Sequence, residues 1–285
     1  MDKEKIVTTR YGHKMRVIEN DLIGEEIIKK GIFDRTGIEL LRFLLQKIPE
    51  AVVLDIGANI GNHSVAIASY VKQLYCFEVQ PKLLALLAEN LRLNKIENAH
   101  IFDFGLSNAN KKLPVYIDNT GNLGRSTLES SLQSPDFTTD LVNLKQGDAV
   151  LAENNVKKVD LIKIDIEGHE IMALLGLQET IQQHRPIITM EWNNDVTREY
   201  FKKFNCQDSL FAGYKMIGVV NRLDRTFWKG KLMRGLRRSI IKATMSPMSK
   251  WEPLLFDFKF DAKYENLIIC PEEKQYLLEG LPWKT

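Results

Sequence analysis

Short apolar runs alternate with amphipathic stretches along most of this 285-residue chain. Residues 52–56 form a run rich in β-branched side chains, which is typical of a parallel strand covered on both faces. Similar runs at 73–77, 99–104 and 159–166 predict further strands. Over 81–93, leucines repeat at helical spacing and predict a helix whose apolar side faces the core. This alternation predicts an α/β fold with a doubly wound, mostly parallel sheet.

Two regions lie outside this alternation. Residues 6–30 alternate in polarity and carry glycines, which indicates a short hairpin and a helix, and the amphipathic stretch 38–48 indicates a second helix. We therefore expect an N-terminal hairpin and helix addition, residues 1–48, before a main domain, residues 49–285. Residues 118–140 are rich in Ser, Thr, Asn, Gly and Asp and predict a long loop, of the kind that often forms a lid or a binding loop.

The most informative segment joins the first core strand to a helix through a tight glycine turn. Asp55 stands where the strand ends, and Gly57 and Gly61 flank the turn. Gly57 permits sharp backbone dihedrals, Gly61 permits close approach of a ligand or of the following helix, and Asn62 is expected to cap that helix. A strand, a glycine turn and a helix in this order predict a nucleotide-cofactor site. The alternative is an ordinary glycine turn in another α/β domain.

Charge indicates which cofactor this site holds. Dinucleotide sites use three glycines in G-x-G-x-x-G to bring backbone amides onto a pyrophosphate. This chain instead has G-A-N-I-G at 57–61, with Asp55 two residues before it, where a carboxylate would repel a pyrophosphate. The same charge suits S-adenosylmethionine, which carries an ammonium and a sulfonium. Glu78 follows the second strand, 21 residues after Gly57, where an acid is expected to accept hydrogen bonds from two ribose hydroxyls.

Several motifs extend this pattern in a fixed order. They are LDIGANIGNHSVAIA at 54–68, FEVQP at 77–81, NLRLN at 90–94, GLSN at 105–108, DLIKIDIEGHE at 160–170 and RPIITMEW at 185–192. Together they resemble the FkbM family of S-adenosylmethionine-dependent methyltransferases over about residues 30–192. The resemblance implies a seven-stranded class I methyltransferase sheet and, most often, methylation of a hydroxyl on a sugar, a glycolipid or a polyketide-like metabolite. The expected cofactor-binding residues are Asp55, Gly57, Ala58, Asn59, Gly61, Asn62, Glu78, Val79 and Asp103.

Five carboxylates fall at or near the ends of predicted strands: Asp55, Glu78, Asp103, Asp165 and Glu191. Ligands of a doubly wound sheet bind beyond the carboxyl ends of its strands, so these acids are expected to converge on one site. Each acid alone would more often be a turn or cap residue.

Methyl transfer to a hydroxyl needs a group that accepts the hydroxyl proton. Asp165 ends the fourth main strand beside the expected methyl position, and we expect it to position the acceptor or to take the proton. His169 has the side chain best suited to a base near neutral pH, although its place in the first turn of a helix equally fits a capping role. Glu191 is the third candidate. Asp165, Glu191 and a neighbouring acid could also hold a divalent cation through oxygen ligands, an alternative that we do not favour.

The composition is ordinary for a globular enzyme, with 44% hydrophobic and 27% charged residues. No apolar run approaches the ~18–20 residues of a membrane span, and the start MDKEKIVTTR is not followed by the apolar core of a signal peptide. We therefore expect a cytoplasmic protein. Cys76, Cys206 and Cys270 are too few and too scattered for a disulfide framework or a zinc site, and are expected as small buried hydrophobes.

The last third contains two expected strands, Tyr214 to Val220 and Tyr264 to Cys270, which the resemblance implies are the antiparallel pair that closes the sheet. An insertion, residues 221–262, separates them. Within it, residues 222–242 carry eight basic residues against one acid, a net charge of +7, so the rest of the +2 chain is −5. Apolar residues at helical spacing make this a basic amphipathic helix, suited to an anionic glycan or to peripheral binding at the inner membrane face. The alternative is a helix that packs its apolar stripe on the main domain.

These patterns predict an S-adenosylmethionine-dependent O-methyltransferase that acts on a hydroxyl of a small molecule or glycan. One rival interpretation is a methyltransferase of another acceptor class, namely a protein, a nucleic acid or a metabolite nitrogen. The other is a catalytically silent cofactor-binding module, against which the intact Asp55, Glu78 and Asp165 argue. A nucleic acid partner is not expected, because the chain lacks an Asn/Asp-Pro-Pro-aromatic box at the end of the fourth strand. The sequence does not determine the oligomeric state.

Overall fold

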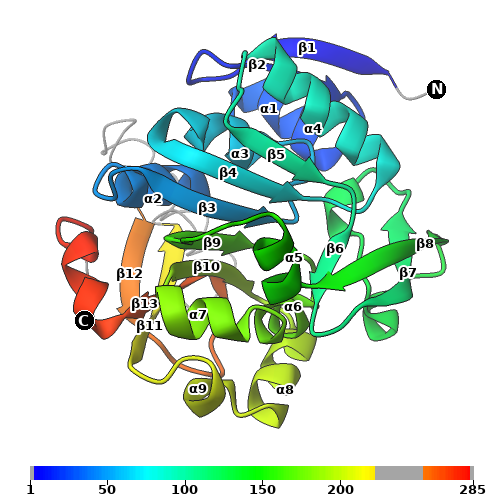
Figure 1. Ribbon diagram of the computed structural model, residues 1–285. Helices are drawn as coiled ribbons and strands as arrows, with labels where there is room; N and C mark the ends of the chain where they lie inside the picture. Colours follow the sequence, from blue (N-terminus) through cyan, green and yellow to red (C-terminus); the bar gives the residue numbers. More distant parts are fainter. Residues whose placement is uncertain (1–2, 222–252, 283–285) are drawn as a thin grey trace, which may run out of the picture.

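The computed structural model describes residues 3–221 and 253–282, which are organised around an eight-stranded sheet (Figure 1). Its strands, in sheet order, are β12 (Pro253–Asp257), β11 (Tyr214–Asn221), β13 (Tyr264–Pro271), β10 (Ile187–Trp192), β9 (Leu161–Ile164), β3 (Ala51–Ile56), β4 (Val71–Phe77) and β5 (Ala99–Phe102). The five strands from β10 to β5 are parallel, whereas β13 is antiparallel to β10 and β11, and β12 is antiparallel to β11. The expected α/β fold with a mostly parallel sheet is confirmed.

The direction of winding reverses at β3, which pairs with β4 on one side and with β9 on the other. From β3 the chain first builds β4 and β5, and then crosses back to form β9 and β10. This reversal is the switch point of a doubly wound sheet, where a crevice opens beyond the carboxyl ends of the two central strands. The residues that follow β3 and β9 are therefore placed beside each other.

Helices cover both faces of the sheet (Figure 1). One set is α1 (Leu22–Lys30), α2 (Arg35–Leu45), α3 (Asn62–Ile67) and α4 (Pro81–Leu93), and the other is α5 (Gly147–Glu153), α6 (Glu170–Leu175), α7 (Gln178–His184), α8 (Asp195–Lys203) and α9 (Cys206–Ser209). Val53 and Leu54 of β3 are both fully buried, yet Val53 belongs to the cluster that contains Leu41 and Leu54 to the cluster that contains Leu174. Successive side chains of a strand point to opposite faces, so this strand contributes to two cores.

The N-terminal segment forms a hairpin of β1 (Glu4–Thr8) and β2 (Lys14–Ile18), followed by α1 and α2. Asn90 of α4 connects this hairpin to the glycine turn. Its Oδ1 accepts from the Arg16 backbone N–H at 2.6 Å, and its Nδ2 donates to the carbonyls of Arg16 at 3.1 Å and Ile60 at 2.8 Å. Met15 and Ile27 also belong to the same hydrophobic cluster as Val53, so the described N-terminal residues 3–48 share a core with the sheet.

A second sheet of three strands lies beside the main one, in the order β6 (Gly105–Ser107), β8 (Phe137–Gln146) and β7 (Lys111–Asp118). The expected loop over 118–140 is therefore shorter, because β8 begins at Phe137. Only Val142 and Leu144 of β8 are buried, and the strand otherwise carries exposed or half-buried side chains. A strand with so few apolar positions has no apolar run to reveal it in the sequence.

In the described parts of the chain the sheet has eight strands, whereas seven were expected. The additional strand, β12, lies within the expected insertion 221–262 and pairs with β11, so that Val219 faces Leu255. β12 is short but apolar, since Leu254 and Leu255 are buried. The expected antiparallel pair of late strands is present as β11 and β13. The predicted basic helix 222–242 lies outside the described residues.

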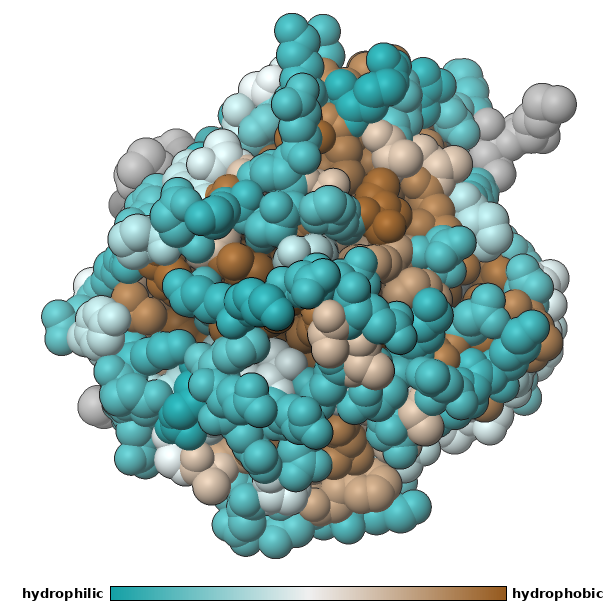
Figure 2. Space-filling view, in the orientation of Figure 1, coloured by the Kyte–Doolittle hydropathy of each residue, from teal (hydrophilic) through white to brown (hydrophobic). Residues whose placement is uncertain are grey.

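The surface in view is covered mostly by hydrophilic side chains with apolar ones between them (Figure 2). Within residues 3–221 and 253–282, no helix has the length and apolar character needed to cross a membrane. The three cysteines are buried and free, as expected, and burial raises the thiol pKa of Cys206 and Cys270 to about 12.

Candidate active site

Two cavities lie beyond the carboxyl ends of the central strands. The large cavity has a volume of about 1040 Å³ and lies between α1, the start of α2, α3 and the edges of β9, β10 and β13. The narrow cavity, about 70 Å³, lies between the glycine turn, the end of β4 and residues 124–128. Asp165, the first residue after β9, lines both cavities. It is the lining residue that the two cavities share.

The glycine turn after β3 forms one wall of the narrow cavity. Gly57 has a φ of +80°, and a Cβ at this position would lie 2.0 Å from the carbonyl oxygen of Asp165, so only glycine fits. The backbone N–H groups of Gly57 and Ala58 both donate to the carbonyl of Phe77, at 2.9 and 3.0 Å. These bonds hold the turn against the end of β4, where Glu78 follows.

Glu78 lines the narrow cavity, and its carboxylate organises the surrounding backbone. One oxygen accepts from the N–H of Asn59 at 2.9 Å, and the other accepts from Val79 at 2.7 Å and Gln80 at 2.9 Å. Burial raises the pKa of Glu78, although the three backbone N–H groups oppose that shift. Two carboxylate oxygens offer about four acceptor sites, so capacity remains for a ligand hydroxyl.

Asp55 does not face either cavity, which corrects the expectation that its charge meets the cofactor directly. The carboxylate is fully buried beneath the glycine turn, accepts from the Ser64 hydroxyl at 2.5 Å and pairs with the Lys163 ammonium at 3.2 Å. Lys163 also donates to the Gly57 carbonyl at 2.9 Å. Burial opposes the charge of Lys163, but Asp55 and then Asp165 outweigh it and raise its pKa. The Asp55 carboxylate is therefore neutralised inside the protein and supports the turn.

The other expected cofactor residues divide into two groups. Asn59 and Val79 line the narrow cavity, as Gly57 and Glu78 do. Ala58 is buried outside both cavities, and Asp103 lies exposed in the turn between β5 and β6, also outside both. Asp103 is placed there because β5 ends at Phe102, one residue before it.

Gly61 and Asn62 connect the turn to neighbouring elements. Gly61 has a φ of +83°, and a Cβ there would lie 2.8 Å from Leu87 of α4, so this glycine allows α3 and α4 to approach. Gly61 is also the N-cap residue of α3, which corrects the expectation that Asn62 caps the helix. Asn62 instead donates from Nδ2 to the Phe33 carbonyl at 3.2 Å.

Two further carboxylates lie close to that of Asp165. Asp165, Glu167 and Glu191 each place an oxygen within 4.8 Å of the others. Burial, and then the charge of Asp165, raises the pKa of Glu167 to about 8 and that of Glu191 to about 9. Glu191 lies where the register of β10 and β13 shifts, and such bulges redirect a side chain. Glu167, expected only as a charge at a helix start, is part of this cluster.

Oxygen ligands from three acids match the preferences of a hard divalent cation. Protonation is another way to relieve the repulsion between these three carboxylates. The raised pKa values of Glu167 and Glu191 allow each acid to hold a proton near neutral pH. The metal alternative stays unfavoured.

His169 is not available as a base, which corrects its place among the catalytic candidates. The ring is buried and lines neither cavity. Its Nδ1 lies 2.8 Å from the Glu129 carboxylate and its Nε2 lies 3.0 Å from the Ser107 hydroxyl, so both nitrogens are engaged. Glu129 also accepts from the Tyr200 hydroxyl at 3.0 Å. His169 therefore holds the loop around Glu129 in place, and residues 124–128 of that loop line the narrow cavity.

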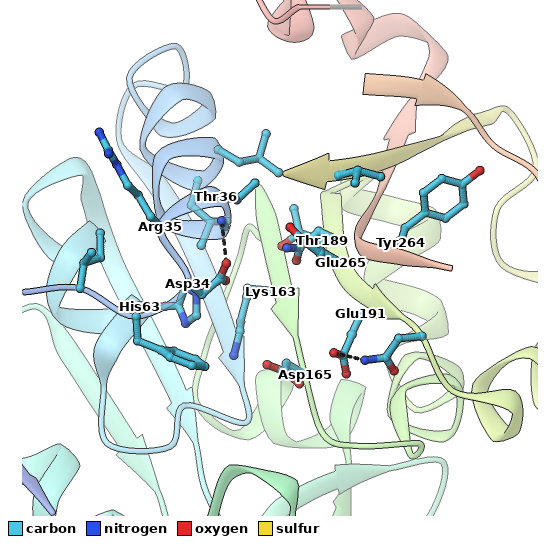
Figure 3. A pocket seen from close by; sticks show the side chains of 18 of the residues that line it. Asp34, Arg35, Thr36, His63, Lys163, Asp165, Thr189, Glu191, Tyr264 and Glu265 are labelled. Carbon is cyan, nitrogen blue, oxygen red and sulfur yellow. Dashed lines mark hydrogen bonds and ion pairs between the residues drawn. The ribbon is translucent and has the colours of Figure 1, made fainter. Parts of the chain in front are cut away.

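The large cavity holds polar groups that sequence patterns did not reveal. Figure 3 shows Asp34 and His63 on one side of Lys163, and Asp165 and Glu191 on the other. Thr189 of β10 is buried, and its hydroxyl has no hydrogen-bond partner within the described parts of the chain. Lone polar residues in otherwise ordinary helix and strand segments have no local signal, because the sheet order brings them together.

Comparison with known proteins shows which families and relatives this sequence resembles. The model of the methyltransferase FkbM domain matches residues 55–212. The 2-O-methyltransferase NoeI of Sinorhizobium fredii is 28% identical over 160 residues, covering 51% of this chain and 65% of that protein. The hexuronic acid methyltransferase AglP of Haloferax volcanii is 30% identical over 149 residues, covering 50% and 57%. The chain thus spans less than two thirds of either relative.

Among solved structures, the methyltransferase FkbM from Methylobacillus flagellatus KT aligns with a TM-score of 0.47 and 16% identity, over 78% of this chain and 44% of that one. The family match covers more than half of the 285 residues and includes the glycine turn, Glu78 and Asp165. The chain is a member of the FkbM methyltransferase family.

Proposed function

We propose that this protein transfers a methyl group from S-adenosylmethionine to a hydroxyl of a sugar or of a sugar-bearing molecule. The observation that carries the proposal is the position of Asp165, which lines both cavities and so joins a cofactor site to an acceptor site. The names of two relatives, a 2-O-methyltransferase and a methyltransferase of a hexuronic acid, support an oxygen acceptor and a sugar.

The residues of the narrow cavity fit the nucleoside of S-adenosylmethionine. Glu78 has acceptor capacity left for ribose hydroxyls, and Leu106, Leu128 and Val79 offer apolar walls for a flat base. Bound there, the cofactor supplies an electrophilic methyl group on a sulfonium. The present volume of about 70 Å³ is below the ~300–1,000 Å³ of typical ligand pockets. We therefore expect residues 119–136 to shift outward when the cofactor binds.

The large cavity suits a hydrophilic acceptor. Charged side chains of both signs line it, together with the hydroxyl of Thr189, whose buried oxygen has no partner in the described residues. A buried hydroxyl without a partner is unfavourable, and a sugar hydroxyl would satisfy it. Asp165 would accept a hydrogen bond from a neighbouring hydroxyl of the sugar and so hold the reacting oxygen in line with the methyl group, about 3–3.5 Å away. A sugar offers the several hydroxyls that such a lining can bind.

The test is to incubate the protein with methyl-labelled S-adenosylmethionine and an extract of the source organism, and then to separate carbohydrate, lipid, protein and RNA. Label in carbohydrate or in a glycolipid supports the proposal. Label in protein or RNA would assign another acceptor class. Binding of S-adenosylhomocysteine without any labelled product would instead favour a silent cofactor-binding module.

A further inference from the structure

A histidine and an aspartate form a pair in the wall of the large cavity. His63, the second residue of α3, places its Nε2 2.9 Å from Oδ2 of Asp34, which directly precedes α2. Both residues line the large cavity together with Asp165. The His63 side chain is 11% exposed, so it is largely enclosed but open to the cavity that it lines. Figure 3 shows this pair across Lys163 from Asp165.

Asp34 is held in place by its own backbone and by α2. It has a φ of +42°, a left-handed conformation, and its Oδ1 accepts from the Gly37 N–H at 3.0 Å as the N-cap of the helix. A Cβ at Gly37 would lie 2.1 Å from Asp34 Oδ2, so the carboxylate occupies the space that a larger residue would take. The bond from Asn62 to the Phe33 carbonyl further joins this segment to α3. The pair is therefore preorganised.

The pairing determines which ring nitrogen is free. An ionised carboxylate only accepts hydrogen bonds, so Nε2 of His63 carries the proton that is shared with Asp34. Burial acts to raise the pKa of Asp34, but His63 and the Gly37 N–H outweigh it, and the pKa lies below its ordinary value. In the neutral ring, Nδ1 then keeps its lone pair. Other charged groups also line this cavity, among them Arg10, Glu26, Lys30, Arg35 and Lys163.

We propose that His63 is the general base of methyl transfer and that Asp34 is its positioning residue. The inference rests on the proposed function, because it concerns the hydroxyl bound beside Asp165. In the step, the acceptor oxygen forms a bond to the methyl carbon while the methyl–sulfur bond breaks and its electron pair stays on sulfur. The hydroxyl proton passes to Nδ1 of His63, and Asp34 stabilises the imidazolium. An imidazole matches this task near neutral pH better than an ordinary carboxylate does.

The first test needs no acceptor. Nitrogen NMR of histidine-labelled protein bound to S-adenosylhomocysteine should show the His63 proton on Nε2, which faces Asp34, and none on Nδ1. In Asp34→Asn the amide can donate to the ring, and the Nδ1–H form should gain population. A proton on Nδ1 of His63 in the wild-type complex would overturn the proposal, whether or not an acceptor has been found.

The second test uses the carbohydrate fraction that takes up label. His63→Gln keeps a donor for Asp34 and similar volume but cannot act as a base, so we expect a loss of roughly 100-fold or more in turnover with S-adenosylhomocysteine affinity within about threefold. Added imidazole should restore part of the activity of His63→Gly. It should not restore His169→Gly, the matched variant of a histidine–carboxylate pair outside both cavities. Near wild-type turnover in His63→Gln, or equal behaviour of the two glycine variants with imidazole, would contradict the assignment.

These tests separate the two proposals. Failure of the wild-type protein to label any fraction counts against the proposed function, while the NMR result still decides the state of His63. If label enters carbohydrate but His63→Gln loses S-adenosylhomocysteine affinity in parallel with turnover, His63 binds cofactor and is not the base.

Discussion

Replacing Lys163 with methionine should expose how the glycine turn is supported. The substitution leaves the Asp55 carboxylate, which is 0% exposed, without its cation, while Ser64 still donates to it. Removing one partner of a buried ion pair typically costs ~3–5 kcal/mol, because the remaining charge is buried and uncompensated. A change of this size corresponds to a fall of roughly 6–20 °C in melting temperature, at about 2–4 °C per kcal/mol for domains of this order of size. Urea denaturation and calorimetry measure both quantities.

Two further variants make this reasoning refutable. Lys163→Met combined with Asp55→Asn removes both charges, so the double variant should be more stable than Lys163→Met alone by about 2–3 kcal/mol. Lys158→Met is the matched control, because its ion pair with Asp160 is 2.8 Å long but the lysine is 56% exposed. We expect it to change stability by less than about 1 kcal/mol. A small cost for Lys163→Met, or additive losses in the double variant, would show that the buried pair does not support the turn.

Four further expectations can be measured directly. Glu78→Ala should weaken S-adenosylhomocysteine binding at least ~10-fold by calorimetry, whereas exposed Asp103→Ala should not; equal affinities would remove the ribose role. The folded state raises the pKa of Glu191 from 4.5 to about 9, so the stability from its bound proton is full below about pH 4.5 and is lost as pH rises through 9. Between about pH 7 and 9.5 the melting temperature of wild type should therefore fall faster than that of Glu191→Gln, and parallel curves would contradict this. Asp165→Asn should keep cofactor affinity and lose about 10-fold in turnover, because Asp165 only positions the acceptor. A loss of ~100-fold or more would instead assign the role of base to Asp165 rather than to His63. If residues 222–242 bind an anionic membrane, binding to anionic vesicles in cosedimentation should weaken as salt rises, and each arginine-to-glutamine change should cost ~1 kcal/mol of binding free energy. Equal binding to neutral vesicles at low salt would refute the membrane interpretation.

Local patterns were enough to identify the core elements. The run 52–56 lies within β3, and the helix expected over 81–93 is α4 with the same bounds. Apolar periodicity, glycine and proline act within a few residues of the chain, so their consequences can be read without knowing the fold. The offset between Gly57 and Glu78 also follows from one strand–turn–helix–strand unit, and both residues line the narrow cavity.

Elements at the edges of the sheets were less visible. β12 has only five residues, and β8 is mostly exposed or half-buried. Their pairing with β11 and β7 stabilises them as strands, and that pairing depends on residues distant in the chain. Periodicity is a weak signal where a strand is short or buries few side chains.

The roles of individual polar side chains depended on the tertiary structure. Lys163 meets Asp55 because β9 pairs with β3, although the two residues are 108 positions apart. His63 meets Asp34 across 29 positions, and His169 is engaged by groups 40 and 62 positions away. A side chain's charge, protonation and access to a ligand are determined by its neighbours in space. The same residue type is therefore proposed as a base at His63, which lines an open cavity, and has a structural role at His169, where both ring nitrogens are engaged.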